Sequence, residues 1–231
     1  MERRKGVKLT VVGSGSSGNT IILQNDNEAL LIDAGIPVLE VKKALGFNIK
    51  KIKGVLVSHV HSDHSKYAAD YEKSYFPVYK PYESGESIQH FDKFTVKPFE
   101  LIHDVPCYGF YIRHPEMGSL IYATDTEFVK YKFPNINHIL IEANYCSEDL
   151  SLDAENKEHV ISGHMEINTA LNFVKNNDNE DLGEVVLMHL SQENADREKF
   201  LRMAKNATTK PVYIAHKGLE IDLSLIPECF R

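Results

Sequence analysis

Short apolar runs recur along most of the chain and predict a protein built largely of β-strands. The runs are rich in Val, Ile, Tyr and Phe, and they are bounded by Gly, Pro, Asn or Asp, as is typical of strands separated by turns. They cover residues 7–12, 20–24, 29–33, 54–58, 94–98, 108–113, 120–123, 139–142, 185–188 and 212–215.

Three other stretches have the spacing of helices. A short helix is predicted over residues 37–45, because Pro37 suits the first helical position. Two later helices repeat apolar residues at i, i+3, i+4 and i+7, namely Ile167, Ala170, Leu171 and Val174 in one and Phe200, Met203, Ala204 and Ala207 in the other. Many strands, with helices early and late, suit two sheets packed face to face under outer helices, an α/β (α+β) fold.

The composition fits one domain that spans residues 1–231. With 42% hydrophobic residues the chain can bury a substantial core. No apolar run approaches the roughly 18 residues of a membrane span, and the short run after the charged start is interpreted as a first strand rather than a secretory signal. Cys107, Cys146 and Cys229 share no close spacing, which argues against a disulfide framework and favours a reducing cytoplasm.

The net charge of −7 argues against a large nucleic-acid groove. Two bound dications would offset about four of those charges. The lysines between positions 42 and 53 are interpreted as a solvated surface, with a local binding patch as the alternative.

The densest chemical feature is the stretch His59-Val60-His61-Ser62-Asp63-His64, which directly follows the apolar run 54–58. Imidazole nitrogens and carboxylate oxygens are ligands of zinc and related divalent metals. A turn after a buried strand points successive side chains in different directions, so that four such groups can serve two ions. A polar loop without metal is the alternative, but tracts this dense usually bind metal.

This pattern, His-x-His-x-Asp-His after a strand, resembles the signature of metallo-β-lactamase-fold hydrolases. Further segments resemble the same family: residues 13–19, 31–35, 123–126 and 187–191, and the lone His103. Together they are most similar to the single-domain phosphodiesterase and nuclease branch, the YycJ/WalJ-like proteins, with tRNase Z and PhnP-type enzymes as cousins. The resemblance implies a four-layer αββα sandwich, which periodicity alone does not predict.

The resemblance also implies a ligand set for two divalent ions, either Zn²⁺ or Mn²⁺. One ion would be held by His59, His61 and His103, the other by Asp63, His64 and His189, with Asp125 bridging both. A helix cap is the alternative role for Asp125, because Ala-Thr-Asp-Thr-Glu is also a helix-start sequence.

A phosphodiesterase reaction is expected from such a site. Water held between the ions is deprotonated near neutral pH, because the dications lower its pKa to about 7. The bridging hydroxide then attacks phosphorus, and Asp63 can orient it. We expect a metal-dependent phosphodiesterase, a nuclease acting on DNA or RNA or an enzyme for small phosphodiesters. The sequence does not indicate an oligomeric state.

His164 narrows the substrate class. The sequence predicts that it opens a helix whose N–H groups face a phosphate oxygen. Family nucleases carry a histidine here that assists the leaving group, usually followed by Ser or Leu, whereas Met165 follows it in this chain. We interpret His164 as a general acid, with a plain helix-start histidine as the alternative.

Other functions are compatible with parts of this pattern. The same site would open a thioester, lactone or β-lactam, but His164 then has no clear task. A di-iron oxygen or nitric oxide reductase places Glu in the position that His61 occupies here. A non-catalytic nucleic-acid-binding module conflicts with the complete ligand set.

The turn at residues 13–19 lacks the Gly-Lys-Ser/Thr end of a phosphate loop, so that a strand-joining turn is the simpler interpretation. The resemblance places this turn at the rim of the site, where Ser17 and Asn19 would touch substrate.

Overall fold

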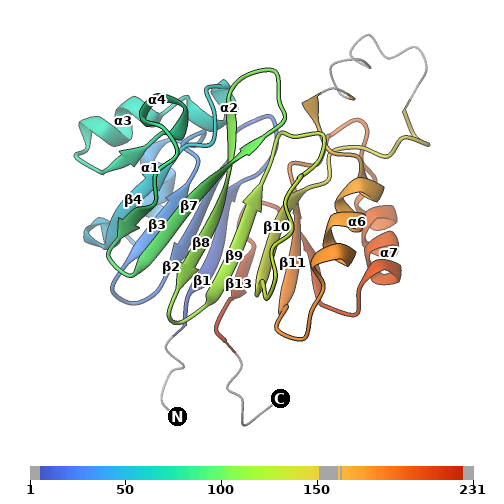
Figure 1. Ribbon diagram of the computed structural model, residues 1–231. Helices are drawn as coiled ribbons and strands as arrows, with labels where there is room; N and C mark the ends of the chain where they lie inside the picture. The colour runs from blue at the N-terminus through green and yellow to red at the C-terminus, as the bar shows by residue number, and fades with distance from the viewer. Residues whose placement is uncertain (1–5, 151–160, 162, 226–231) are drawn as a thin grey trace.

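The computed structural model describes residues 6–150, 161 and 163–225, and it contains two β-sheets packed face to face (Figure 1). The first sheet has the strand order β13-β1-β2-β3-β4-β5. Its strands are β1 (Lys8–Gly13), β2 (Thr20–Gln24), β3 (Ala29–Ile32), β4 (Ile52–Leu56), β5 (Val78–Tyr79) and β13 (Glu220–Asp222). Strands β3, β4 and β5 are parallel to one another, and the other pairs are antiparallel.

The second sheet has the order β12-β11-β10-β9-β8-β7-β6. The strands from β6 to β9 pair antiparallel, and those from β9 to β12 pair parallel. Their bounds are β6 (Gln89–Phe91), β7 (Phe94–Leu101), β8 (Cys107–His114), β9 (Gly118–Ala123), β10 (His138–Glu142), β11 (Glu184–Met188) and β12 (Val212–Ile214).

Helices lie outside both sheets (Figure 1). Beside the first sheet are α1 (Val38–Ala44), the 3₁₀ turn η1 (Ile49–Lys51), α2 (Ser62–Ser65), α3 (Ala68–Lys73) and α4 (Pro81–Ser84), and beside the second are α6 (Ile167–Asn177) and α7 (Arg197–Ala207). The two long helices begin at acidic caps, because the carboxylates of Glu166 and Asp196 accept hydrogen bonds from the first free N–H groups.

The side-chain alternation of the strands divides the core into three layers. Leu30 and Ile32 of β3 point between the sheets, whereas Leu31 packs with Val41 of α1 and Tyr71 of α3. A third cluster joins the outer face of the second sheet to α6 and α7. The predicted αββα sandwich is therefore confirmed.

All ten predicted strands and the three predicted helices are present, with bounds shifted by a few residues. The sequence missed β5, β6, β13, α2, α3 and α4, which are too short to show a periodic pattern. Cys107 and Cys146 are buried free thiols, while Cys229 lies outside the described residues. Among the described helices, none combines the length and apolarity that crossing a bilayer requires.

The strand directions explain how distant residues meet. Strands β9, β10 and β11 are parallel, and β7 runs in the same direction because two antiparallel pairings separate it from β9. In the first sheet, β1, β3 and β4 likewise share one direction. The segments that follow these strands carry the predicted site residues, and they meet at one rim of the sandwich.

Candidate metal centre

Three polar residues turn the chain sharply where strands end. Asp33, Asp125 and His189 follow β3, β9 and β11, and their φ angles are 63°, 52° and 52°. This left-handed conformation is uncommon outside glycine, although Asp and His are enriched in it, and it costs on the order of 1–3 kcal/mol per residue. Such conformations cluster at functional sites, where the strain is part of how side chains are positioned.

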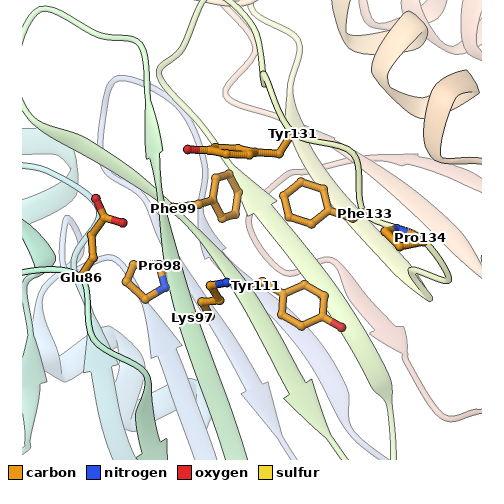
Figure 2. Close-up of a pocket in the computed structure, with 8 residues that line it drawn as sticks. All are labelled: Glu86, Lys97, Pro98, Phe99, Tyr111, Tyr131, Phe133 and Pro134. Carbon is orange, nitrogen blue, oxygen red and sulfur yellow. The ribbon is translucent and has the colours of Figure 1, made fainter.

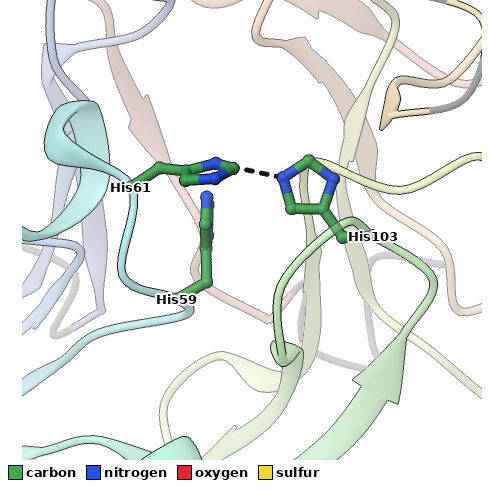
Figure 3. Close-up of side chains that lie close together, drawn as sticks. All are labelled: His59, His61 and His103. Carbon is green, nitrogen blue, oxygen red and sulfur yellow. Dashed lines mark hydrogen bonds between the residues drawn. The ribbon is translucent and has the colours of Figure 1, made fainter. Parts of the chain in front are cut away.

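The first ligand group consists of His59, His61 and His103, whose rings converge from the loop after β4 and the loop after β7 (Figure 3). The Nδ1 atom of His61 lies 3.2 Å from Nε2 of His103. Within the described chain, the buried Nε2 of His59 and the buried Nδ1 of His103 have no hydrogen-bond partner. Buried polar atoms are nearly always paired, so the orphaned Nε2 of His59 beside two other imidazoles is typical of a cation-binding site.

The second ligand group consists of Asp63, His64, Asp125 and His189. The Nε2 atom of His64 lies 3.2 Å from the Asp63 carboxylate and 3.1 Å from that of Asp125. The Nε2 atom of His189 lies 3.2 Å from Asp63 and 3.7 Å from Asp125. Asp125 does not cap a helix, because the described residues 126–136 contain none. The alternative interpretation of Asp125 as a helix N-cap is therefore wrong.

The buried carboxylate of Glu142 adjoins the second ligand group. Glu142, which ends β10 and is fully buried, places Oε1 2.7 Å from Nδ1 of His164 and 3.2 Å from Nδ1 of His189. Its other oxygen accepts the backbone N–H of Thr126. One carboxylate thus orients a proposed metal ligand and the proposed general acid.

A second buried carboxylate, that of Asp33, holds the ring of His64 directly and the ring of His59 through Ser58. Its Oδ2 lies 2.6 Å from Nδ1 of His64 and accepts the hydroxyl of Tyr122. Its Oδ1 accepts both the N–H and the hydroxyl of Ser58, each at 2.8 Å. The Ser58 hydroxyl also lies 3.0 Å from Nδ1 of His59. Metal-bound histidines usually have such a partner at their other nitrogen.

The electrostatics of the two groups differ. Burial lowers the pKa of His59 to about 3, and the charge of His64 adds to this effect. Burial would also lower the pKa of His64 and His189, but nearby carboxylates outweigh it. Asp125 and Asp33 raise the pKa of His64, and Asp125 with hydrogen bonds to Asp63 and Glu142 raises that of His189 to about 10. The second group therefore attracts positive charge, which protons or a metal ion can supply.

The turn at residues 13–19 reaches the second group through Asn19. Its amide nitrogen lies 3.1 Å from the Asp63 carboxylate and 2.9 Å from Nε2 of His64. Asn19 is buried and Ser17 exposed. Contact of either residue with substrate remains a prediction.

The expectation that His164 opens a helix is wrong. Helix α6 begins at Ile167, and Glu166 caps it by accepting the N–H groups of Asn168 and Thr169. His164 precedes this cap, and the pKa of its ring is raised: burial opposes the rise, but the hydrogen bond to Glu142 outweighs it. The N–H groups at the start of α6 are therefore bonded to Glu166 and are not free to bind a phosphate, contrary to the prediction from the sequence.

The structure brings together all eight residues that the sequence singled out for the site. It adds Glu142, Asp33 and Ser58, which the sequence analysis did not identify. The signal for Glu142 and Asp33 was an acidic residue at the end of a strongly apolar run. Two further histidines, His114 and His138, lie away from the site and pair with Glu28 and Glu184, and His159 lies outside the described residues.

Comparison with known proteins agrees with this geometry. Residues 13–133 match the Metallo-beta-lactamase superfamily. The chain belongs to this superfamily. It is 26% identical over 226 residues to exodeoxyribonuclease YycJ of Bacillus anthracis, an alignment that covers 84% of this chain and 86% of YycJ.

Solved structures share the fold. The metallo-beta-lactamase fold protein YhfI from Bacillus subtilis superposes with a TM-score of 0.74 at 20% identity, covering 94% of this chain and 99% of YhfI. Human tRNase Z, short form, has a TM-score of 0.60 at 16% identity, covering 94% and 100% of the two chains.

The superfamily implies divalent metal ions, and the residues fit them. Each ligand group gathers its donor atoms within 4.8 Å of one another. The orphaned nitrogen of His59 and the close pair of ring nitrogens in His61 and His103 are explained by a shared cation. Mixed imidazole and carboxylate donors suit Zn²⁺ and Mn²⁺.

Proposed function

We propose that this protein is a divalent-metal-dependent phosphodiesterase that uses two ions to cleave nucleic acid. The observation that carries the proposal is the meeting, at one rim, of the two ligand groups and His164. Seven donors are too many for one tetrahedral ion, and a two-metal centre suits in-line displacement at phosphorus. The exodeoxyribonuclease name of the relative YycJ favours DNA.

The first ion would be held by His59, His61 and His103. The second would be held by Asp63, His64 and His189, and Asp125 would be shared by both ions. When bound, such ions activate a water molecule and neutralise charge at the reacting phosphate.

The chain's own residues would do the rest. Asp33 and Ser58 hold the rings of His64 and His59 in their orientations through the contacts given above. Asp63 has a second carboxylate oxygen with which to orient the attacking water. His164, fixed at Nδ1 by Glu142, would pass a proton to the departing sugar oxygen, a poor leaving group without one. His164 and His189 both line a cavity of about 260 Å³ that extends to Ser16. The end of the substrate would lie in this cavity.

The test is metal analysis combined with nuclease assays. The purified protein is reconstituted with Zn²⁺ or Mn²⁺, its metal content is measured, and it is assayed on labelled single-stranded and duplex DNA and RNA. We expect two equivalents of metal and cleavage that a chelator abolishes. At most one equivalent after reconstitution, or turnover of thioesters or lactones with none of phosphodiesters, would overturn the proposal.

A further inference from the structure

The outer face of the second sheet has an aromatic hollow that the metal centre does not use (Figure 2). The hollow has a volume of about 430 Å³, and four of its lining residues are the aromatic residues Phe99, Tyr111, Tyr131 and Phe133. The first two come from β7 and β8, and the other two come from the segment that follows Asp125.

Local sequence explains why these rings are held open and rigid. Phe99 pairs across the strands with Gly109, and a side chain at that glycine would come within 2.3 Å of the Phe99 ring. The ring therefore lies across β8. Tyr111 and Phe133 stack with centroids 6.1 Å apart and planes 8° apart, and Tyr131 meets Phe99 edge-on at 5.6 Å. Such mutual packing fixes ring orientations, so that the hollow is formed in advance of any ligand.

The two segments that wall the hollow also lead along the chain to residues of the proposed metal centre. Phe99 lies four residues before His103, a distance of roughly 13 Å along an extended strand. The segment that forms the other wall starts at Asp125. A hydrogen bond joins the segment after Phe99 to the segment after Asp125, because the N–H of Ile102 donates to Thr126 Oγ1 at 3.0 Å. Between the hollow and the metal centre, Ile102 and Phe128 have exposed apolar side chains, with 38% and 43% of their surfaces accessible. At about 3.4 Å per stacked nucleotide, some four nucleotides would cover the distance.

Cations accompany the rings although the chain as a whole is acidic. Lys97 lines the hollow, and Arg113 follows Tyr111 by two residues on the same face of β8. The Nζ atom of Lys130 lies 5.2 Å from the centroid of the Tyr131 ring. The acidic neighbours are Glu86, which also lines the hollow, and Glu100, which pairs with Lys130 at 3.4 Å. Of the four rings, Tyr131 is exposed, Tyr111 and Phe133 are half-buried, and Phe99 forms the buried floor. Accessible rings beside cations are what single-stranded nucleic acids bind, through base stacking and phosphate contacts.

We propose that the aromatic hollow binds bases of a single strand of nucleic acid whose scissile phosphate lies in the metal centre. This inference rests on the proposed function and adds the substrate class: a strand extending several nucleotides from the cut, unpaired over the hollow. Apolar aromatic hollows also receive protein partners, including a second copy of the same chain, and the experiment separates these cases.

The experiment compares binding by Tyr131→Ala with binding by Tyr213→Ala. Tyr131 and Tyr213 expose 37% and 38% of their surfaces, and Tyr213 lies on the edge strand β12, at the other end of the second sheet from β7, so that the second variant is a matched control. The metal-loaded proteins are titrated into an end-labelled, phosphorothioate-linked thymidine 20-mer, which resists cleavage, and fluorescence anisotropy gives the Kd. Tyr131→Ala should raise the Kd about tenfold, and Tyr213→Ala should leave it within twofold. Equal Kd values for the two variants would overturn the inference.

Two further measurements identify the cause of a failure. Wild-type hydrolysis of bis-p-nitrophenyl phosphate, which is too small to reach from the metal centre to the hollow, tests the proposed reaction alone. If this substrate is cleaved but the 20-mer is not bound, the hollow inference is wrong and the phosphodiesterase proposal stands. If the 20-mer is bound through Tyr131 but no phosphodiester is cleaved, the proposed function is wrong instead. A dimer in light scattering that Tyr131→Ala dissociates, without a change in Kd, would assign the hollow to self-association.

Discussion

The two ligand groups occupy one rim but differ in how they hold together without an ion. The second group is a network of histidines and carboxylates, in which Asp63 and Asp125 contact the rings directly and Asp33 and Glu142 support them from behind. The first group, His59, His61 and His103, contains no carboxylate and leaves two buried nitrogens without a partner in the described chain. The second group is therefore organised in advance, whereas in the first group the buried Nε2 of His59 would gain a partner only from a bound ion.

This difference implies that the two groups would bind their ions in different ways. Carboxylates that surround the second group supply the negative charge that attracts a dication, and a preformed arrangement lowers the cost of binding. The first group offers three imidazoles. The Ser58 hydroxyl contacts the ring of His59, and the exposed carboxylate of Asp104 lies 3.4 Å from His61 and 3.1 Å from His103. Substitutions in the two groups should consequently fail in different ways, and the following predictions test this contrast.

The largest effect is expected from Asp125→Asn. Asparagine tolerates the left-handed backbone at this position and keeps the side-chain shape, so that the main loss is a charge beside His64 and His189. Ion stabilisation of a transition state amounts to several kcal/mol, and we expect phosphodiesterase activity to fall by at least about 10³-fold with a thermal midpoint close to that of the wild type.

Asp92→Asn is the matched control. Asp92 also has a left-handed backbone, with φ of 55°, and contacts Lys53 away from the rim. If Asp125→Asn keeps near-normal activity and metal content, Asp125 is not part of the ion-binding network and the contrast between the groups must be redrawn.

The next effect concerns His164, which contacts the second group through Glu142. His164→Ala should retain both ions and lose about 10²–10³-fold in activity on nucleic acid, because the sugar oxygen then leaves without a proton. The loss on bis-p-nitrophenyl phosphate should be much smaller, since nitrophenolate is a good leaving group. His90→Ala, at an exposed histidine on β6, is the control.

Kinetics on the two substrates with parallel metal analysis check this role. Equal losses on both substrates would exclude the general acid role, and the absence of one ion would make His164 a ligand.

The sequence predicted the groups but not their supports. A short motif with four donors marks the metal centre because its residues are adjacent in the chain, and the apolar runs before His103, Asp125 and His189 mark strand ends. Glu142 and Ser58 are different, because their roles depend on partners brought beside them by neighbouring strands. Asp33 follows the strand next to that of Ser58, and His164 lies 22 residues beyond Glu142. A buried acid at the end of a strand is a detectable signal, but its partner is set by strand order. The position of His164 was misjudged for a related reason, since the local pattern of α6 did not reveal that Glu166 caps it.

A smaller difference between the two groups is expected in their affinities for Mn²⁺. Mn²⁺ prefers oxygen donors, so the first equivalent should bind the second group. Asp63→Ala should weaken that first binding step about 100-fold, whereas His59→Ala should leave it unchanged and remove the second step. Electron paramagnetic resonance of free Mn²⁺ during titration measures both steps. The reverse pattern would show that three imidazoles outcompete the carboxylates, and that pre-organisation does not set the order.

The smallest effect tests the link that Ser58 forms between the first group and the buried carboxylate of Asp33. Asp33 reaches His64 directly at 2.6 Å but reaches His59 only through the Ser58 hydroxyl. Ser58→Ala should therefore loosen the His59 ring while the Asp33–His64 contact persists. The Ser58 hydroxyl also lies 3.5 Å from Nδ1 of His64, a longer contact than its 3.0 Å to His59. Loss of such an orienting partner typically costs 10–100-fold in metal affinity, and we expect about tenfold, mainly on the second equivalent of metal. Ser119→Ala, which removes a buried hydroxyl bonded to Asn137 away from the rim, should change neither step. A loss spread equally over both equivalents would mean that Ser58 supports the two groups alike, and that their contrast in the structure has no counterpart in binding.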